Sequence, residues 1–279
     1  MAKADLHIHT TASDGRSTPE QIIKNARKHK LEIISITDHD TIRGFRKASD
    51  IAEEYEVELL PGVEITADFS GRECHLLAYC FDPDHPAIGQ LMAQHYKSRL
   101  ERGKWILGQL SKEGLQVDID EVKAEANGSN IGRPHIASVL VDKGYVASFK
   151  EAFIRYLSDE ALGDIYNEYY SHHEVIKKVK EAGGVISIAH PGSMYSEEEL
   201  EQLVEAGVDG IEFLHPSHDY KTQKQIEQFA EKHHLLTTGG SDFHGGDTDY
   251  QKFFGVVTIN TTYVHQLKRL AKQRKELLV

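Results

Sequence analysis

Histidines and carboxylates stand at the ends of apolar runs in this sequence, where side chains from different predicted strands can meet. His7 and His9 close the first run, and alternation along a strand places both imidazoles on one face. Two such imidazoles make half of a metal site, although a lone His-x-His pair can also be two hydrogen-bonded strand residues. Residues of the same types follow that run or end later ones: Asp14, His39, Glu64, His75, His190, His215, Asp242 and His244. Because chance does not readily place one at every strand end, the set predicts a metal centre.

Two aspartates flank one of these histidines. Asp38 and Asp40 stand on either side of His39. They either orient its imidazole by hydrogen bonding or cap the helix that follows, and the sequence favours neither role over the other.

The composition narrows the class of protein. The chain has 279 residues, and metal ligation is the first candidate reason for its 17 histidines. Hydrophobic residues at 39% and charged residues at 27% are typical of a folded globular protein. The net charge of -12 disfavours a groove that follows a long nucleic acid, but it permits a small phosphorylated ligand held by bound cations.

The sequence also carries no sign of membrane insertion or export. No run approaches the roughly 20 apolar residues that span a bilayer, and no secretory signal is visible at the start. Cys74 and Cys80 would lie too far apart on one strand to form a disulfide. We therefore expect a cytoplasmic protein with reduced cysteines and no membrane contact.

Strand and helix patterns alternate along most of the chain. Strands are expected at 3–9, 32–37, 57–66, 72–81, 185–189, 210–214, 235–239 and 255–259. Helices are expected at 17–30, 43–55, 172–183, 197–206, 220–233 and 262–276. This alternation predicts parallel βαβ units in a barrel or a doubly wound sheet. The stretch 95–171 is helical without a strand, so we expect it to be an insertion between 1–94 and 172–279.

The motifs at these strand ends resemble a known family, the PHP (polymerase and histidinol phosphatase) superfamily. They are DLHIHTTASDG (5–15), ITDHDT (36–41), PGVEI (61–65), ECHLLAY (73–79), AHP (189–191) and GGSDFH (239–244). GRPHIA (132–137) and GIEFLHPSH (210–218) resemble one branch, whose small phosphoesterases act on nucleoside 3′,5′-bisphosphates and on the 5′ ends of short RNA. The resemblance implies a distorted seven-stranded β/α barrel with an inserted helical cap domain.

The resemblance also implies which residues hold metal. Two to three divalent ions are expected, and imidazole with carboxylate ligands suits Mn, Fe or Zn without ranking them. The implied first set is His7, His9, Glu64 and Asp242. The implied second set is Glu64, His75 and His190, and the implied third is Asp14, His39 and His244.

The expected reaction is hydrolysis of a phosphate monoester of a small nucleotide by attack of a hydroxide that bridges two metals, with Glu64 and Asp242 in the catalytic set. Arg133 is expected to grip the phosphate and to neutralise charge on its oxygens. His135 and His215 would complete the phosphate pocket, and one of them would protonate the leaving group. His218 either joins this pocket or lies outside it.

Several alternatives stay open. The substrate could instead be a mononucleotide or histidinol phosphate, and the barrel could hydrolyse an amide or a lactone. A non-enzymatic module is disfavoured, because every implied ligand position holds a competent residue. Trp105 and the Tyr166–Tyr170 group would pack a helical core or stack on a nucleobase. The segment 162–170 is acidic and aromatic, whereas relatives often have a Gly-rich, basic one there.

Overall fold

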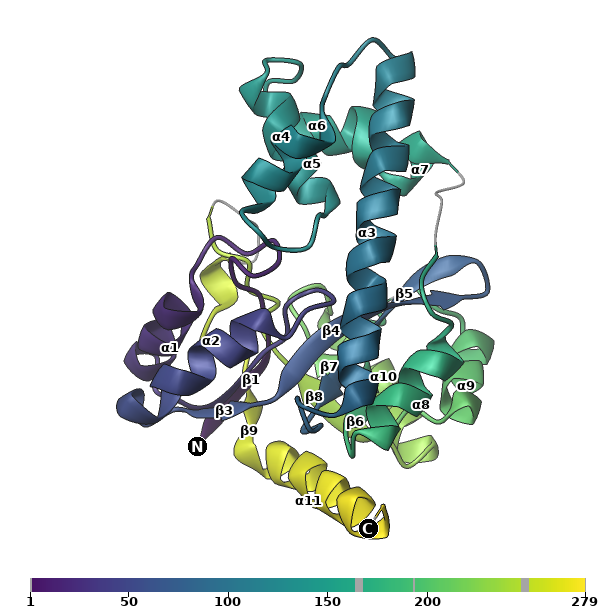
Figure 1. Ribbon diagram of the computed structural model, residues 1–279. Helices are drawn as coiled ribbons and strands as arrows, with labels where there is room; N and C mark the ends of the chain where they lie inside the picture. Colours follow the sequence, from purple (N-terminus) through teal and green to yellow (C-terminus); the bar gives the residue numbers. More distant parts are fainter. Residues whose placement is uncertain (1, 164–167, 193, 247–250, 279) are drawn as a thin grey trace.

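The computed structural model describes residues 2–163, 168–192, 194–246 and 251–278, which form two β-sheets and surrounding helices (Figure 1). The first sheet has the strand order β3-β2-β1-β9, with bounds β1 Lys3–Ile8, β2 Leu31–Ile36, β3 Glu58–Leu60 and β9 Ile259–Asn260. The second has the order β4-β5-β6-β7-β8, with bounds β4 Gly62–Phe69, β5 Arg72–Tyr79, β6 Val185–Ile188, β7 Gly210–Leu214 and β8 Leu236–Gly239. Strands are parallel except for β9 against β1 and for β5 against both neighbours.

The structure confirms the mixed α/β class, and its sheets differ in detail from the expected seven-stranded barrel. The described residues form nine strands in two sheets, and these strands do not close into one ring. Isolated bridges join the sheets, one between Ile8 and Phe243 and one between His39 and Glu64. The sheets therefore meet where the candidate ligands lie.

Two predicted strands were wrong in their extent. The run 57–66, predicted as one strand, is divided between β3 and β4 on different sheets. Pro61 stands at the break and has no N–H to donate to a ladder. Of the run 255–259, only the last residue enters a strand, because a short 3₁₀ turn at Gln251–Phe253 and Gly255 at φ +71° bend the chain first.

Helices cover the two sheets, and most of them agree with the predicted ranges. They are α1 Pro19–Lys28, α2 Arg43–Ala52, α8 His172–Glu181, α9 Glu197–Ala206, α10 Tyr220–Lys232 and α11 Thr261–Leu277. Figure 1 shows α1 and α2 beside the first sheet, α8 to α10 beside the second, and α11 below both.

The stretch between β5 and α8 is helical, as predicted, but its first helix begins nine residues before the expected boundary at 95. The long helix α3 spans Pro86–Lys112 and runs upward from the sheets in Figure 1. Short helices gather near its upper end: α4 Ile119–Ala126, α5 Arg133–Asp142, α6 Phe149–Ala152, the π-helix η2 Phe153–Leu157 and α7 Asp159–Leu162.

Helix α3 contributes to two separate hydrophobic cores. Ile88 and Leu91, near its start, pack into the core around β4 to β6. Ile106 and Leu110, near its end, pack into a second core formed by the upper helices. Burying one such side chain contributes roughly 1.5–3 kcal/mol, so both ends of α3 are firmly held.

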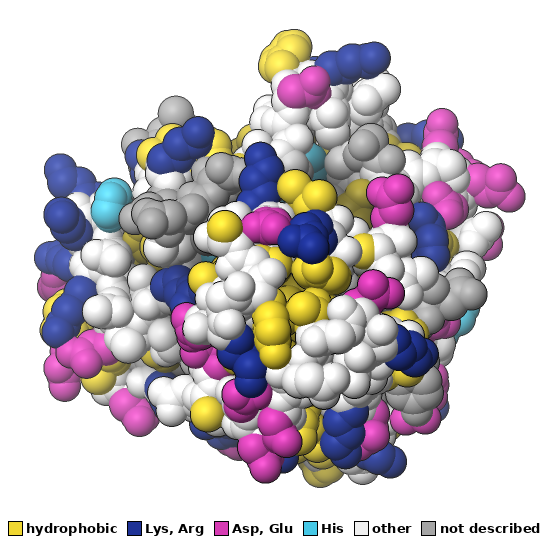
Figure 2. Space-filling view, turned by 90° about the horizontal axis from the view of Figure 1, so that it is seen from above, with side chains coloured by type: hydrophobic (Ala, Val, Ile, Leu, Met, Phe, Trp, Pro, Cys, Tyr) yellow, Lys and Arg dark blue, Asp and Glu magenta, His cyan; other side chains and the backbone are white. Residues whose placement is uncertain are grey.

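The surface of the upper helices carries charges of both signs. Figure 2 shows Lys and Arg interspersed with Asp and Glu around a central patch of hydrophobic side chains. Among the described residues, no helix is long and apolar enough to cross a membrane. Cys74 and Cys80 are buried and free, as predicted.

Candidate metal centre

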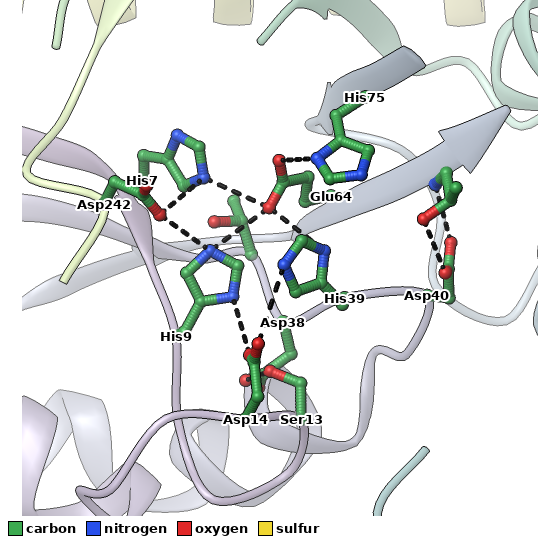
Figure 3. Close-up of polar contacts among 12 residues, drawn as sticks. His7, His9, Ser13, Asp14, Asp38, His39, Asp40, Glu64, His75 and Asp242 are labelled. Carbon is green, nitrogen blue, oxygen red and sulfur yellow. Dashed lines mark hydrogen bonds and ion pairs between the residues drawn. The ribbon is translucent and has the colours of Figure 1, made fainter. Parts of the chain in front are cut away.

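All nine predicted ligands converge where the two sheets meet. Figure 3 labels His7, His9, Asp14, His39, Glu64, His75 and Asp242. His7 lies on β1, His9 directly follows its last residue, and Asp14 stands on the loop beyond. His39 follows β2, while Glu64 and His75 lie on the antiparallel pair β4 and β5. The last three follow the strands β6 and β8, at His190, Asp242 and His244. The structure therefore brings together the nine residues that were predicted as ligands from their places near strand ends.

Glu64 lies at the centre of this cluster and is 1% exposed. Its Oε1 is 2.9 Å from both His75 Nδ1 and His190 Nε2. Its Oε2 is 3.2 Å from His7 Nε2 and His9 Nε2, and 3.3 Å from His39 Nδ1. One carboxylate thus contacts five imidazoles, with different partners on each oxygen.

Four donor-atom pairs in the first predicted ligand set have the spacing of ligands that share one ion. Asp242 Oδ1 lies 3.3 Å from His7 Nε2 and 3.2 Å from His9 Nε2, and the same two nitrogens are 3.2 Å from Glu64 Oε2. Ligands around a tetrahedral ion with bonds of about 2.0–2.1 Å lie ~3.3–3.4 Å apart. Among the described residues, His7, His9 and Glu64 converge as one group that could hold an ion, and Asp242 converges with His7 and His215 in another.

The third predicted set is wider, and it gains one member. Asp14 Oδ1 is 3.5 Å from His244 Nε2, and Asp14 Oδ2 is 3.9 Å from His39 Nε2. His9 Nδ1 also lies 3.7 Å from Asp14, so the two ring nitrogens of His9 face two different groups of ligands. The residues that can converge on an ion here are His9, Asp14, His39 and His244.

Buried polar atoms without hydrogen bonds supply the test of whether this donor set fits metal. Both ring nitrogens of His9, Nδ1 of His39 and His75, and Oδ1 of Asp14 are buried without a hydrogen-bond partner among the described residues. Buried polar atoms in proteins are nearly always paired. Lone pairs from imidazole and carboxylate that converge without hydrogen bonds fit the coordination of divalent ions.

The charges in the cluster depend on one another. Burial by itself lowers the pKa of His9, but Asp242 and Glu64 outweigh it and raise this pKa to about 10. Burial is also the main reason why the pKa of His39 falls to about 3. Without a cation, protons on some imidazoles therefore balance the carboxylates, and a bound ion would replace them.

Sequence reasoning missed Glu212, which lies on β7 and is fully buried. Its Oε1 is 2.9 Å from Nδ1 of His7, and its Oε2 accepts the backbone N–H of His190 at 2.6 Å. The available signal was an acidic residue inside the apolar run 210–214. A carboxylate in a strand interior is not selected by a pattern of ligand residues at strand ends.

Asp5, also missed, supports the same end of β1. It accepts hydrogen bonds from the backbone N–H groups of Ser241 and His7, at 2.9 and 3.3 Å. Burial raises its pKa to about 7, against these hydrogen bonds. Asp5 thereby joins the backbone just before Asp242 to β1.

Neither role considered for the aspartates beside His39 is the one they take. Asp38 accepts from the N–H and hydroxyl of Thr10 at 2.7 and 2.8 Å and from Ser13 Oγ at 2.7 Å, so it holds the loop that carries Asp14. Asp40 accepts from the backbone N–H of Thr66 at 2.7 Å and pairs with Arg99. Helix α2 has no side-chain cap.

Two predicted phosphate residues begin helix α5. Arg133 donates to Asp159 Oδ1 at 2.5 Å and to the carbonyl of Leu157 at 3.2 Å, at the end of the π-helix. His135 accepts the N–H of Gly132 at Nδ1, so its Nε2–H donates to the carbonyl of Ser13 at 3.1 Å. A cavity of about 250 Å³ separates this helix from the loop after β1, and its lining includes Asp14, Arg16, Glu125, His135 and Ser138.

The other two predicted substrate residues follow β7. His215 Nε2 is 3.2 Å from Asp242 Oδ2, and its Nδ1 accepts the N–H of Ser217 at 3.1 Å. His215 can also join His7 and Asp242 as a metal ligand. His218 donates from Nδ1 to the carbonyl of Phe213 and accepts the N–H of Gly192 at Nε2. Both nitrogens of His218 are thus used in joining two loops.

The aromatic residues of the insertion are packed where the structure describes them. Trp105 packs against the core of the upper helices, and Tyr170 against the core of the second sheet. Tyr169 stacks on His95, with ring centroids 5.4 Å apart. Tyr166 lies outside the described residues.

Comparison with known proteins matches residues 5–231 to the PHP domain family. The phosphoribosyl 1,2-cyclic phosphate 1,2-diphosphodiesterase of Eggerthella lenta is 31% identical over 245 residues, which cover 86% of this chain and 94% of that protein. The 5′-3′ exoribonuclease of Haemophilus influenzae is 32% identical, covering 87% and 90%. The 3′,5′-nucleoside bisphosphate phosphatase of Chromobacterium violaceum is 31% identical, covering 88% of each protein.

A solved structure has the same overall fold. It is a protein of Bifidobacterium adolescentis described as a metal-dependent phosphoesterase, with a TM-score of 0.87, 34% identity and 96% of each chain covered. The family match, the full-length relatives and this structure agree with one another. The chain therefore belongs to the PHP domain family, as its strand-end motifs indicated.

Proposed function

We propose that this chain is a metal-dependent phosphoesterase that hydrolyses a phosphate monoester of a small nucleotide, either a nucleoside 3′,5′-bisphosphate or a short 5′-phosphorylated oligonucleotide. The observation that carries this proposal is buried Glu64, whose two oxygens contact separate sets of imidazoles. Such a bridging carboxylate is the arrangement that a cluster of neighbouring ions requires. The names of the relatives from C. violaceum and H. influenzae favour nucleotide substrates.

The nine ligand residues would hold two or three ions of Mn, Fe or Zn. Imidazole and carboxylate donors suit all three metals. Divalent ions held there would supply an ionised water as nucleophile near neutral pH and would neutralise charge on the phosphoryl oxygens. The residues of this chain fix the ligand atoms, orient the phosphate and deliver a proton to the leaving group.

The hydrogen bonds favour His215 over His135 as the proton donor. Burial lowers the pKa of His135, and both of its nitrogens are used by Gly132 and Ser13. Nδ1 of His215 also lies 2.7 Å from Ser217 Oγ, which can accept a hydrogen bond from the second N–H of an imidazolium, so Nε2 beside Asp242 can give up its proton and leave a neutral ring. We propose that His215 protonates the leaving oxygen from Nε2, and that His218 only holds the surrounding loops.

We further propose that the helical stretch 95–171 is a cap over the two sheets formed by 1–94 and 172–279, and that these sheets act as the distorted barrel implied by the motifs. The cavity beside Asp14 lies between the loop after β1 and helices α4 and α5, and its volume is about 250 Å³. Arg133 begins α5, two residues before His135 in the cavity wall. The mixed charge of the face in Figure 2 favours a small substrate over a long polymer.

The test is phosphate release by Mn²⁺-loaded protein from adenosine 3′,5′-bisphosphate, with 5′-AMP, 3′-AMP, histidinol phosphate and a 5′-phosphorylated RNA trimer alongside. We expect the bisphosphate or the trimer to be hydrolysed with the highest kcat/KM. The product identifies the attacked group, since 5′-AMP remains if the 3′ phosphate is removed. Equal, slow release from every monoester would contradict the nucleotide assignment, and no release with a full metal complement would contradict hydrolysis of a phosphate monoester.

A second substrate is favoured by the relative from E. lenta, of which this chain covers 94%. Its name identifies phosphoribosyl 1,2-cyclic phosphate as the substrate of that protein. This cyclic ester belongs in the same assay, because ring opening without phosphate release would be missed by a phosphate measurement. Faster opening of this ester than any monoester hydrolysis would replace the nucleotide assignment.

A further inference from the structure

We propose that Glu212 is a positioning residue that fixes the tautomer of His7 and the place of His190, and thereby keeps the ligands around both oxygens of Glu64 ready to bind metal. This inference rests on the proposed function only in assuming that the cluster binds divalent ions. Glu212 itself belongs to none of the converging ligand groups among the residues that the structure describes. It would therefore act through the two histidines that it contacts.

The position of Glu212 lets one side chain support two sheets. It lies on β7 in the second sheet and is 0% exposed. Oε1 lies 2.9 Å from Nδ1 of His7, which belongs to β1 in the first sheet. Oε2 accepts the backbone N–H of His190 at 2.6 Å, directly after β6. These two histidines contact opposite oxygens of Glu64.

The chemistry of a carboxylate determines which proton His7 keeps. An ionised carboxylate has only acceptors, so Nδ1 of His7 must carry the hydrogen in the bond to Oε1. The lone pair needed for a metal is then available at Nε2, once that nitrogen is deprotonated. Nε2 is the atom that lies 3.2 Å from Glu64 Oε2 and 3.3 Å from Asp242 Oδ1. A carboxylate behind a ligating imidazole orients the ring in this way.

Substitution of one atom tests this argument. Glu212→Gln keeps the shape of the side chain but offers one acceptor and one donor group. The backbone N–H of His190 can only donate, so it takes the amide oxygen. The amide NH₂ then faces Nδ1 of His7 and requires an acceptor there, which places the proton on Nε2 and blocks the ligand atom.

The experiment measures metal and tautomer directly rather than activity. We expect the Zn²⁺-loaded Glu212→Gln protein to bind its weakest ion 10–100-fold less tightly in competition with a chelator. Imidazole ¹⁵N–¹H spectra should show that His7 has lost the Nδ1–H signal seen in wild type. Glu212→Asp keeps two acceptors on a shorter side chain, so it should retain that signal with a smaller loss of affinity. It also serves as the readout if the Gln variant fails to fold.

Asp209→Asn is the matched control, because it changes a carboxylate just before the same strand. Asp209 accepts the N–H of Ile186 at 3.0 Å and pairs with Arg274 at 2.7 Å, so this variant should lose stability. Its zinc affinity and the His7 spectrum should match wild type. Unchanged zinc affinity and an unchanged His7 tautomer in Glu212→Gln would overturn the proposal. If the metal results hold but wild type hydrolyses no phosphate ester, the proposed function fails and this inference stands.

Discussion

Arg133, which is expected to bind substrate, is paired in this structure with a carboxylate of its own chain. Its guanidinium pairs with Asp159, whose side chain is 77% exposed, and also donates to the carbonyl of Leu157. An exposed carboxylate is a weak competitor, because water screens the pair. A phosphate dianion with bidentate geometry offers a guanidinium a stronger partner. We therefore expect substrate to displace Asp159.

Replacing Arg133 should separate catalysis from metal binding. In Arg133→Ala, we expect kcat/KM to fall by about 100-fold or more, because a cation facing the phosphoryl oxygens is lost. The metal content, measured by elemental analysis, should match wild type. Arg133→Lys should recover part of the loss, since a lysine keeps the charge without the fork.

Arg155→Ala controls for loss of a cation from the same helical region. Arg155 is 51% exposed and pairs with Glu151 on its own segment, so its removal should leave turnover unchanged. Wild-type turnover in Arg133→Ala would refute the assignment of Arg133 to the phosphate.

The ligand residues and their supports differed in how well they could be predicted. His7 and His9 stand at the end of an apolar run. Their alternation along the strand and their side-chain type both indicate metal ligands. For Glu212 no pattern indicated a role at the site, because an acidic residue within a short strand can face outward as well as be buried. His218 was left open, and its two hydrogen bonds follow from loop contacts that sequence spacing does not encode.

At the scale of elements, a buried ion pair joins α3 to the loop after β2, and a hydrogen bond from the same arginine joins α3 to β4 in the second sheet. Arg99 Nε lies 2.6 Å from Asp40 Oδ2, and its Nη2 donates to Thr66 Oγ1 at 3.1 Å. Burial raises the pKa of Asp40, but Arg99 and then His95 outweigh it and lower this pKa to about 2. Asp40 immediately follows the candidate ligand His39, so the pair also bears on the metal centre.

Breaking this pair should be costly. In Arg99→Met, Asp40 remains buried without its cation, and we expect the free energy of unfolding at pH 7 to fall by about 3–5 kcal/mol. The native pKa of Asp40 lies below its unfolded value of 3.8, so its contribution is present above pH 3.8 and is lost as the pH falls towards 2. The difference between wild type and variant should therefore shrink over this range in urea denaturation.

A surface pair provides the comparison for Arg99. Arg46 pairs with Asp84, whose side chain is 78% exposed, so Arg46→Met should change stability little. Equal effects of the two substitutions would contradict the importance of burial at Arg99.

Element boundaries were predictable where one signal dominates and failed where tertiary contacts decide. Helices α9 and α10 were predicted closely, because capping residues and periodicity coincide there. The break at Pro61 was missed, since the apolar run continues through it and only the sheet contacts separate its halves. The sequence also could not show that the strands form two sheets instead of one closed barrel. The sheets are joined by two single bridges and not by a ladder of hydrogen bonds.

At the scale of the whole molecule, we expect bound metal ions to stabilise the native state in place of the protons that stabilise it without metal. The native pKa of His9, about 10, exceeds its unfolded value of 6.5. Its contribution is therefore fully present below pH 6.5 and is lost as the pH rises to 10. We expect chelator-treated protein to lose several degrees of Tm between pH 7 and 10, whereas metal-loaded protein should lose much less.

Thermal unfolding in buffers of increasing pH measures this exchange. His9→Asn provides the control, because without the imidazole the slope of the chelator-treated protein should flatten. The same pH dependence for loaded and chelator-treated wild type would mean that the ions do not occupy the place of these protons.

The sharing of α3 between two hydrophobic cores limits how parts of this protein can be exchanged with those of relatives. A chimera with its junction before Pro86 brings in a foreign α3 that must fit the core beside β4 to β6. A junction after Lys112 retains α3, so the incoming helices need to pack only against its C-terminal half. Exchange of the upper helices should therefore succeed at the second junction more readily than at the first.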